Sequence, residues 1–306
     1  MTAVQEPLAP PPAAAPATPS RPSTRARAAT TVPAGVDVAV WIVAAISGLC
    51  LGFLAFLLVL SPLQQARSQD LLYAEFRDQL AAATAPFEAE PITPGAPVGI
   101  IEAKTIGLRQ VVVEGTGGRD LRAGPGHSRA SAFPGQPGQA VLIGRSTTYG
   151  APFGDIDELA AGDRIDIVTG QGAFTYVVDG VRRDGDPVPL EVADGESRLT
   201  LVTAAGDPLR PSSTVYVDAD LQGYAAVAPP RVPLLVPPFE APMASDLSAL
   251  LPLALWLLLL LAVAGFVAWG VTRWGRLQTW VVAAPLTLAA IWGASDAAAL
   301  LLPNLM

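Results

Sequence analysis

Long apolar runs separated by polar and Pro-rich stretches dominate the pattern of this chain. Three of these runs reach the roughly 20 mostly apolar residues that a helix needs to cross a bilayer core. They cover residues 38–60, 247–272 and 280–302. The pattern therefore predicts one transmembrane helix in the first part of the chain and two in the last part.

Between the first two runs the period of the pattern changes. Within residues 61–97, apolar side chains at Leu72, Phe76 and Leu80 are four apart, which favours a juxtamembrane helix with one apolar face. From residue 98 to 224, short β-type runs are separated by Gly, Pro and Asp, and seven or eight strands at this spacing indicate a mainly β barrel or sandwich. The runs cover residues 98–106, 110–114, 140–145, 164–169, 174–183, 198–203 and 214–221.

Two stretches outside these elements have the composition of tails or linkers. Residues 1–37 consist mainly of Pro, Ala, Thr and Ser with three arginines, too little apolar bulk to offset the entropy of ordering, so we predict a disordered cytoplasmic tail. Residues 225–246 are rich in proline and predict a stiff, extended linker back to the membrane.

Basic residues next to the apolar runs predict the orientation. Arg21, Arg25 and Arg27 precede the first run, and Arg273 and Arg276 lie in the short turn between the second and third. Because basic flanks stay on the cytoplasmic side, both groups are expected inside. The sequence thus predicts a multi-pass protein of the cell membrane with its β domain extracellular.

Charge and rare residues exclude several classes of function. The formal net charge of −8 argues against a nucleic-acid partner, because binding to phosphates depends on clustered Lys and Arg. The single cysteine, Cys50, lies within the first apolar run, and the single histidine is His127. This leaves no intrachain disulfide and none of the common zinc sites, and we expect neither a metal nor a cofactor.

Motifs in the β region resemble those of a known family. The stretch "GPGH" at 124–127 is followed by "VLIGRSTTYGAPF" at 141–153 and "RLTLVTAAG" at 198–206. This series resembles the sortases, most closely the class E type of actinobacteria. The resemblance implies a membrane-anchored, extracellular β-barrel of eight strands, and a cysteine transpeptidase activity that cleaves Leu-Pro-x-Thr-Gly-like sorting signals and joins them to an amine.

The same resemblance implies that the catalytic positions of this chain are degenerate. Sortases use a thiolate nucleophile, a histidine that protonates the leaving amine and an arginine that stabilises the oxyanion or holds the peptide. The position expected for the histidine is Arg145, the position of the cysteine is Ala204, and that of the arginine is Ser213 or Thr214. The chain therefore resembles a pseudo-sortase.

The leading hypothesis is a non-catalytic module that binds a sorting-signal-like peptide or a cell-surface protein. A guanidinium group binds carboxylates and peptide carbonyls through its rigid fork of donors. The candidate peptide-binding residues are accordingly Arg145, Thr203 and Arg210.

Two alternatives remain open at this stage. The first is an active sortase-family transpeptidase or hydrolase with Thr203 or Ser213 as nucleophile and His127 as base. The second is a role carried mainly by the apolar runs, through Asp296 and a membrane partner, because an ionisable residue inside a span is costly.

Overall fold

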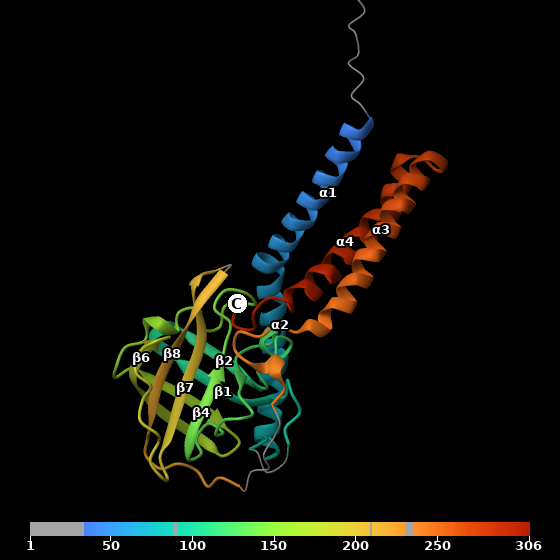
Figure 1. Ribbon diagram of the computed structural model, residues 1–306. Helices are drawn as coiled ribbons and strands as arrows, with labels where there is room; N and C mark the ends of the chain where they lie inside the picture. Colours follow the sequence, from blue (N-terminus) through green and yellow to red (C-terminus); the bar gives the residue numbers. More distant parts are fainter. Residues whose placement is uncertain (1–33, 88–90, 209, 230–235) are drawn as a thin grey trace, which may run out of the picture. The chain divides into compact units, whose positions relative to one another are not determined.

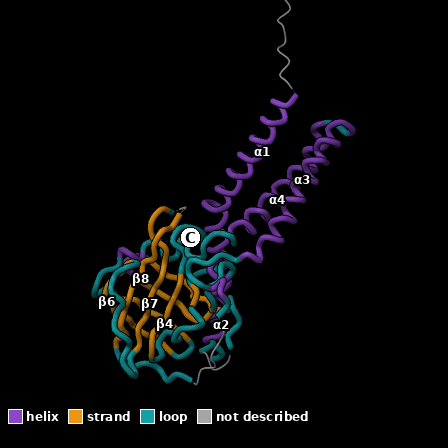
Figure 2. The backbone as a smooth tube through the Cα atoms, in the orientation of Figure 1, coloured by secondary structure: helices purple, strands orange, loops and turns teal. Residues whose placement is uncertain are grey.

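The computed structural model describes residues 34–87, 91–208, 210–229 and 236–306, and most of the tail predicted over residues 1–37 lies outside them. Figures 1 and 2 show the described strands gathered in one barrel.

The helices of the first part of the chain form one continuous run. Helix α1 covers Ala34–Ala55, a π-helical turn η1 covers Phe56–Leu60, and helix α2 covers Ser61–Ala81. Phe76 on α2 is fully buried, and the side chain of Gln69 hydrogen-bonds to both main-chain groups of Val111 on the barrel wall. The four-residue spacing seen in the sequence thus corresponds to the face of α2 that packs on the barrel.

Two further helices follow the barrel as a hairpin. Helix α3 covers Leu250–Arg273 and α4 covers Arg276–Ala299, with the 3₁₀ turn η6 at Leu247–Ala249 before them. By length and composition, three helices of the described chain are apolar enough to cross a membrane. Helix α4 ends three residues before the predicted limit at 302, so residues 300–302 leave the helix.

The eight strands close into a barrel, which confirms the predicted fold class. Their order around the wall is β1-β2-β3-β4-β7-β8-β6-β5. The strands are β1 Pro97–Ala103, β2 Leu108–Glu114, β3 Gly126–His127, β4 Gly138–Ile143, β5 Arg164–Thr169, β6 Gly172–Arg183, β7 Ser197–Asp207 and β8 Arg210–Gln222.

The alternation along β4 and β7 separates an inner from an outer face of the wall. Ala140 and Leu142 of β4 and Leu199 and Leu201 of β7 belong to the main core of the barrel. The intervening apolar side chains form a second cluster, because successive residues of a strand point to opposite faces. We call this second surface the outer face; it consists of Val141, Ile143, Val202, Ala204 and Tyr216.

The stretch predicted as a linker is partly attached to the barrel. The 3₁₀ turn η5, Pro238–Glu240, packs on the wall, where Glu240 is buried and its carbonyl accepts a hydrogen bond from the Thr116 hydroxyl. Residues 230–235 of the predicted linker lie outside the described residues.

Candidate functional site

The strand register brings three predicted positions together on the barrel wall. Ala204 on β7 lies directly opposite Thr214 on β8. Ile143 of β4 pairs with Val202 of the parallel strand β7, and the amide of Gly144, just after β4, donates a hydrogen bond to the Val202 carbonyl. Arg145, two residues after Ile143, therefore lies beside Ala204, two residues after Val202. The positions that the resemblance assigns to histidine, cysteine and arginine therefore converge at one end of the outer face.

The register also separates the two candidates for the arginine position. Ser213 pairs with Ala205 and therefore points away from the face that Ala204 and Thr214 share. Of the two positions that the sequence left open, Thr214 is the one that lies beside Ala204.

Arg145 is a fully buried cation whose guanidinium group donates to three oxygen atoms. Its Nη1 donates to the Met306 oxygen at 2.9 Å and to Thr148 Oγ1 at 3.2 Å, and its Nη2 donates to the Gly118 carbonyl at 3.0 Å. The Tyr149 ring lies 5.0 Å from the guanidinium carbon.

These groups lack the chemistry of a cysteine transpeptidase. Burial lowers the pKa of Arg145 to about 10, so the guanidinium stays charged at neutral pH and is a poor proton donor to a leaving amine. The Ala204 methyl group cannot attack a carbonyl, and the Thr214 hydroxyl carries no charge to stabilise an oxyanion. The arrangement can hold main-chain oxygens of a peptide.

The residues of the alternative catalytic set do not face the outer face. Thr203 points to the inner side of β7, and its hydroxyl donates to the Gly144 carbonyl at 3.0 Å. His127 is fully buried; its Nδ1 lies 2.9 Å from Glu114 Oε2 and its Nε2 lies 2.9 Å from the Ala132 carbonyl. Arg210 is exposed beside the β7–β8 turn, opposite Asp207.

A segment that the sequence did not single out covers the site. Residues 300–306 return from α4 to the barrel (Figure 1). The side chain of Leu305 joins the buried cluster that contains Ala204. The available signal was the stretch Leu-Pro-Asn at 302–304, which repeats the first three positions of a Leu-Pro-x-Thr-Gly signal and of which only Leu302 fell within the predicted third span.

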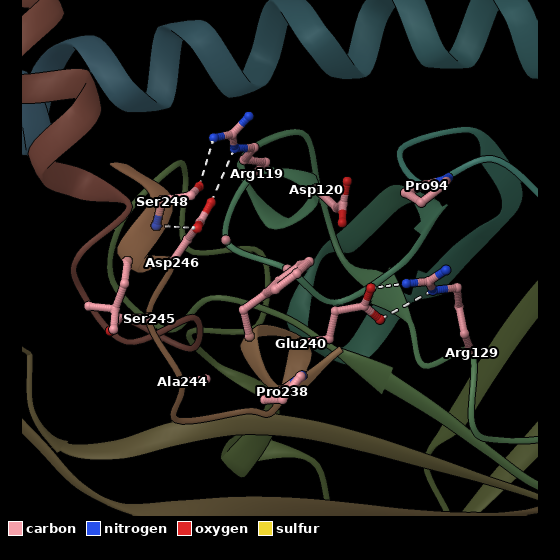
Figure 3. A pocket seen from close by; sticks show the side chains of 14 residues that line it. Pro94, Arg119, Asp120, Arg129, Pro238, Glu240, Ala244, Ser245, Asp246 and Ser248 are labelled. Carbon is pink, nitrogen blue, oxygen red and sulfur yellow. Dashed lines mark hydrogen bonds and ion pairs between the residues drawn. The ribbon is translucent and has the colours of Figure 1, made fainter. Parts of the chain in front are cut away.

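A cavity of about 690 Å³ adjoins this segment and shares Gly118, Phe239 and Ala244 with its contacts (Figure 3). Asp120 lines it, and burial together with the nearby Glu240 carboxylate raises the pKa of Asp120 to about 6. Glu240 itself forms an ion pair with Arg129 at the cavity wall.

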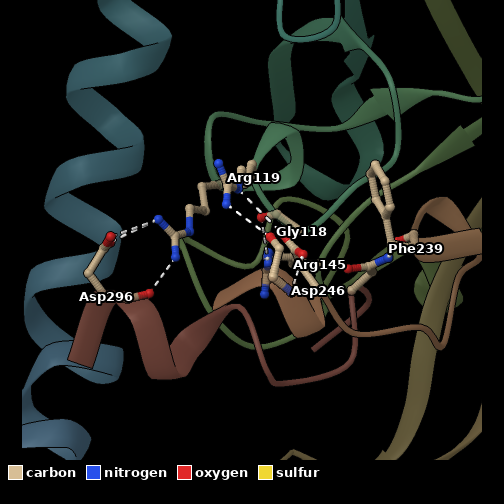
Figure 4. Close-up of polar contacts among 9 residues, drawn as sticks. Gly118, Arg119, Arg145, Phe239, Asp246 and Asp296 are labelled. Atoms are coloured by element: carbon tan, nitrogen blue, oxygen red, sulfur yellow. Dashed lines mark hydrogen bonds and ion pairs between the residues drawn. The ribbon is translucent and has the colours of Figure 1, made fainter. Parts of the chain in front are cut away.

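Helix α4 is connected to the barrel by an ion pair. Arg122 Nη1 lies 3.0 Å from both carboxylate oxygens of Asp296, and its Nη2 donates to the Asp296 carbonyl (Figure 4). The same guanidinium lies 5.6 Å from the Tyr149 ring. The Asp296 carboxylate, which the sequence placed within the third apolar run, therefore has its partner on the barrel, in the 3₁₀ turn η3, Asp120–Arg122.

Comparisons with known proteins agree with the motifs. The sortase domain model matches residues 101–222. Sortase D of Bacillus subtilis is 37% identical over 84 residues, which are 28% of this chain and 41% of that protein, so the match spans less than half of the relative.

Two solved structures extend the comparison. Sortase E of Streptomyces avermitilis is 30% identical over 43% of this chain and 91% of its own, with a TM-score of 0.37. The Sortase D5 transpeptidase of Clostridium perfringens is 26% identical over 51% of this chain and 99% of its own, with a TM-score of 0.45. Residues 101–222 of this chain thus form a domain that matches the sortase family model.

Proposed function

We propose that this chain is a non-catalytic, membrane-tethered sortase of the class E type whose barrel binds a sorting-signal-like peptide or a cell-surface protein. The observation that carries the proposal is the convergence of Arg145, Ala204 and Thr214 at one end of the outer face. A nucleophile, a general acid and a fixed cation act as a unit, so the loss of all three side chains removes the activity rather than weakening it.

The binding role is supported by the groups that remain. Arg145 holds two main-chain oxygens, and the outer face beside it is apolar, which suits an extended peptide with apolar side chains. The motif "VLIGRSTTYGAPF" at 141–153 supports the class E assignment. The basic turn between α3 and α4 supports a barrel on the outside of the membrane.

The experiment that tests the proposal uses the full chain in detergent micelles. The protein is incubated with Leu-Pro-x-Thr-Gly peptides and an amine acceptor, and the mixture is analysed by mass spectrometry, with a catalytically active sortase as the control. We expect intact peptide and no acyl adduct on the chain. If peptide cleavage or a covalent adduct is detected and persists in the His127→Ala variant, the proposal is overturned. If that cleavage or adduct is instead lost in the His127→Ala variant, the result identifies the alternative catalytic set.

A further inference from the structure

Residues 300–306 lack regular secondary structure, yet residues 304–306 are as buried as the core. Asn304, Leu305 and Met306 are 0%, 0% and 3% exposed. Burial of a segment outside helices and strands requires partners for its main-chain groups, because an unpaired buried amide or carbonyl is costly. The contacts of this segment show where those partners lie.

Asn304 connects the segment to the loop before α3 through hydrogen bonds. Its side-chain amide donates to the carbonyls of Phe239 and Ala241 at 2.7 and 2.9 Å, and its main-chain amide donates to the Ala244 carbonyl at 2.9 Å. A Cβ at Gly118 would lie 3.0 Å from Asn304 Oδ1, so a glycine is needed for this close approach.

The last two residues are held by the loop that follows β4. The Leu305 carbonyl accepts hydrogen bonds from the amide and the hydroxyl of Ser146, at 2.9 and 3.2 Å. The Met306 oxygen accepts from Arg145 Nη1 at 2.9 Å and from Thr148 Oγ1 at 2.5 Å. Each of these donors belongs to the stretch that occupies the expected histidine position and the residues just after it.

We propose that residues 300–306 are an internal occupant of the peptide site, which lies between Arg145 and Ala204 and which an external Leu-Pro-x peptide can enter only after the segment leaves. The chemical class of the external ligand, a Leu-Pro-x peptide, rests on the proposed function. The role of residues 300–306 as internal occupant rests on their own hydrogen bonds and burial.

The sequence of the segment agrees with this role. Leu302, Pro303 and Asn304 match the first three positions of a Leu-Pro-x-Thr-Gly signal, whereas Leu305 and Met306 replace its Thr-Gly pair. The residue in the fourth position, Leu305, is the one that packs with Ala204. The segment thus combines the Leu-Pro-x part of a sorting signal with the apolar side chain of Leu305, which packs in the cluster of the outer face.

The first arm of the test measures whether the segment covers the site. In a Cys50→Ala background, Ala204→Cys places one thiol under the segment, and its rate of modification by a charged methanethiosulfonate reports opening in the full chain. We expect Leu305→Asp to accelerate modification by about tenfold or more, because a buried leucine side chain is lost from the cluster. The matched control Leu305→Ile keeps the apolar contact and is expected to modify slowly.

The second arm measures binding of a fluorescent Leu-Pro-Asn-Thr-Gly peptide to the chain without the reporter thiol. We expect Leu305→Asp to bind about tenfold or more tightly than Leu305→Ile, because a site that is more often open has a higher apparent affinity. Added Leu-Pro-Asn-Leu-Met peptide is expected to compete.

The outcomes separate the two proposals. Fast thiol modification in the Leu305→Ile control overturns the inference, since the segment then does not cover Ala204. Equal peptide affinity in both variants also overturns it and leaves the proposed function standing. Accelerated modification in Leu305→Asp with no peptide binding to any variant supports the covering role and overturns the proposed function instead.

Discussion

Asp120 is a carboxylic acid whose ionisation is opposed by its surroundings. Burial raises its pKa to about 6 from 3.8, and the Glu240 carboxylate adds to this, whereas the Gly117 amide and Arg129 act in the opposite direction. Between pH 4 and 6 the folded protein therefore binds more protons than the unfolded chain. Its stability decreases as the pH rises through this window, and the full penalty is present above pH 6.

Replacement of this carboxyl group should remove that penalty. We expect Asp120→Asn to raise the free energy of unfolding at pH 7.5, on the order of 1 kcal/mol after allowance for solvent screening, and to leave it nearly unchanged at pH 4. Thermal unfolding of the full chain in detergent at both pH values measures the difference. Asp194→Asn, in an exposed loop, is the control, and a gain for Asp120→Asn that does not depend on pH contradicts the assignment.

At the scale of elements, the contact between α4 and the barrel depends on the ion pair of Arg122 with Asp296. The side chains of Arg122 and Asp296 are 15% and 33% exposed, so the pair is screened less than a typical surface pair. Arg122 Nη1 contacts both carboxylate oxygens and Nη2 contacts the Asp296 carbonyl, and hydrogen bonds from a charged donor are stronger than those between neutral groups.

A double-mutant cycle measures this contribution. We expect Arg122→Gln and Asp296→Asn to be coupled by about 1 kcal/mol or more in the unfolding of the full chain in detergent. The control cycle uses Arg198 and Asp220 on the barrel, where the Asp220 side chain is 51% exposed and a smaller coupling is expected. Equal coupling in the two cycles would show that the α4 contact adds nothing beyond a surface pair.

Strands could be predicted from the sequence where a local run of β-type residues marks them. Seven of the eight strands among the described residues follow from β-type runs, although β7 extends further than predicted, to Asp207, and β8 begins earlier, at Arg210. The strand that was missed, β3, has two residues and no period to detect. It exists because Gly126 and His127 pair with β2 on one side and β4 on the other, which are contacts that no local pattern encodes.

The candidate site was predictable only in part, for the same reason. The motifs locate Arg145 and Ala204, but the choice between Ser213 and Thr214 needed the register of β7 with β8. The buried position of Leu305 could not be derived from an apolar run that ends a membrane helix. Its partners in the cluster, such as Val202 and Ile143, lie more than 100 residues earlier in the chain.

At the scale of the whole molecule, the barrel contacts both ends of the α3–α4 hairpin. Before α3, Asp246 pairs with Arg119 at 3.2 Å, and after α4, the Met306 oxygen accepts a hydrogen bond from Arg145. If α3 and α4 cross a bilayer, both of these ends lie on the same side as the barrel. The turn with Arg273 and Arg276 then lies on the opposite side, which is the cytoplasmic side for a basic turn.

This topology predicts which introduced thiols are accessible from outside the cell. In a Cys50→Ala background, we expect Glu191→Cys, in the exposed loop between β6 and β7, to react with a membrane-impermeant maleimide on intact cells. Gln278→Cys, near the turn between α3 and α4, is expected to react only after lysis. The reverse result would place the barrel in the cytoplasm, where it would have no access to cell-surface peptides. Reaction of both thiols on intact cells would mean that the hairpin does not cross the membrane.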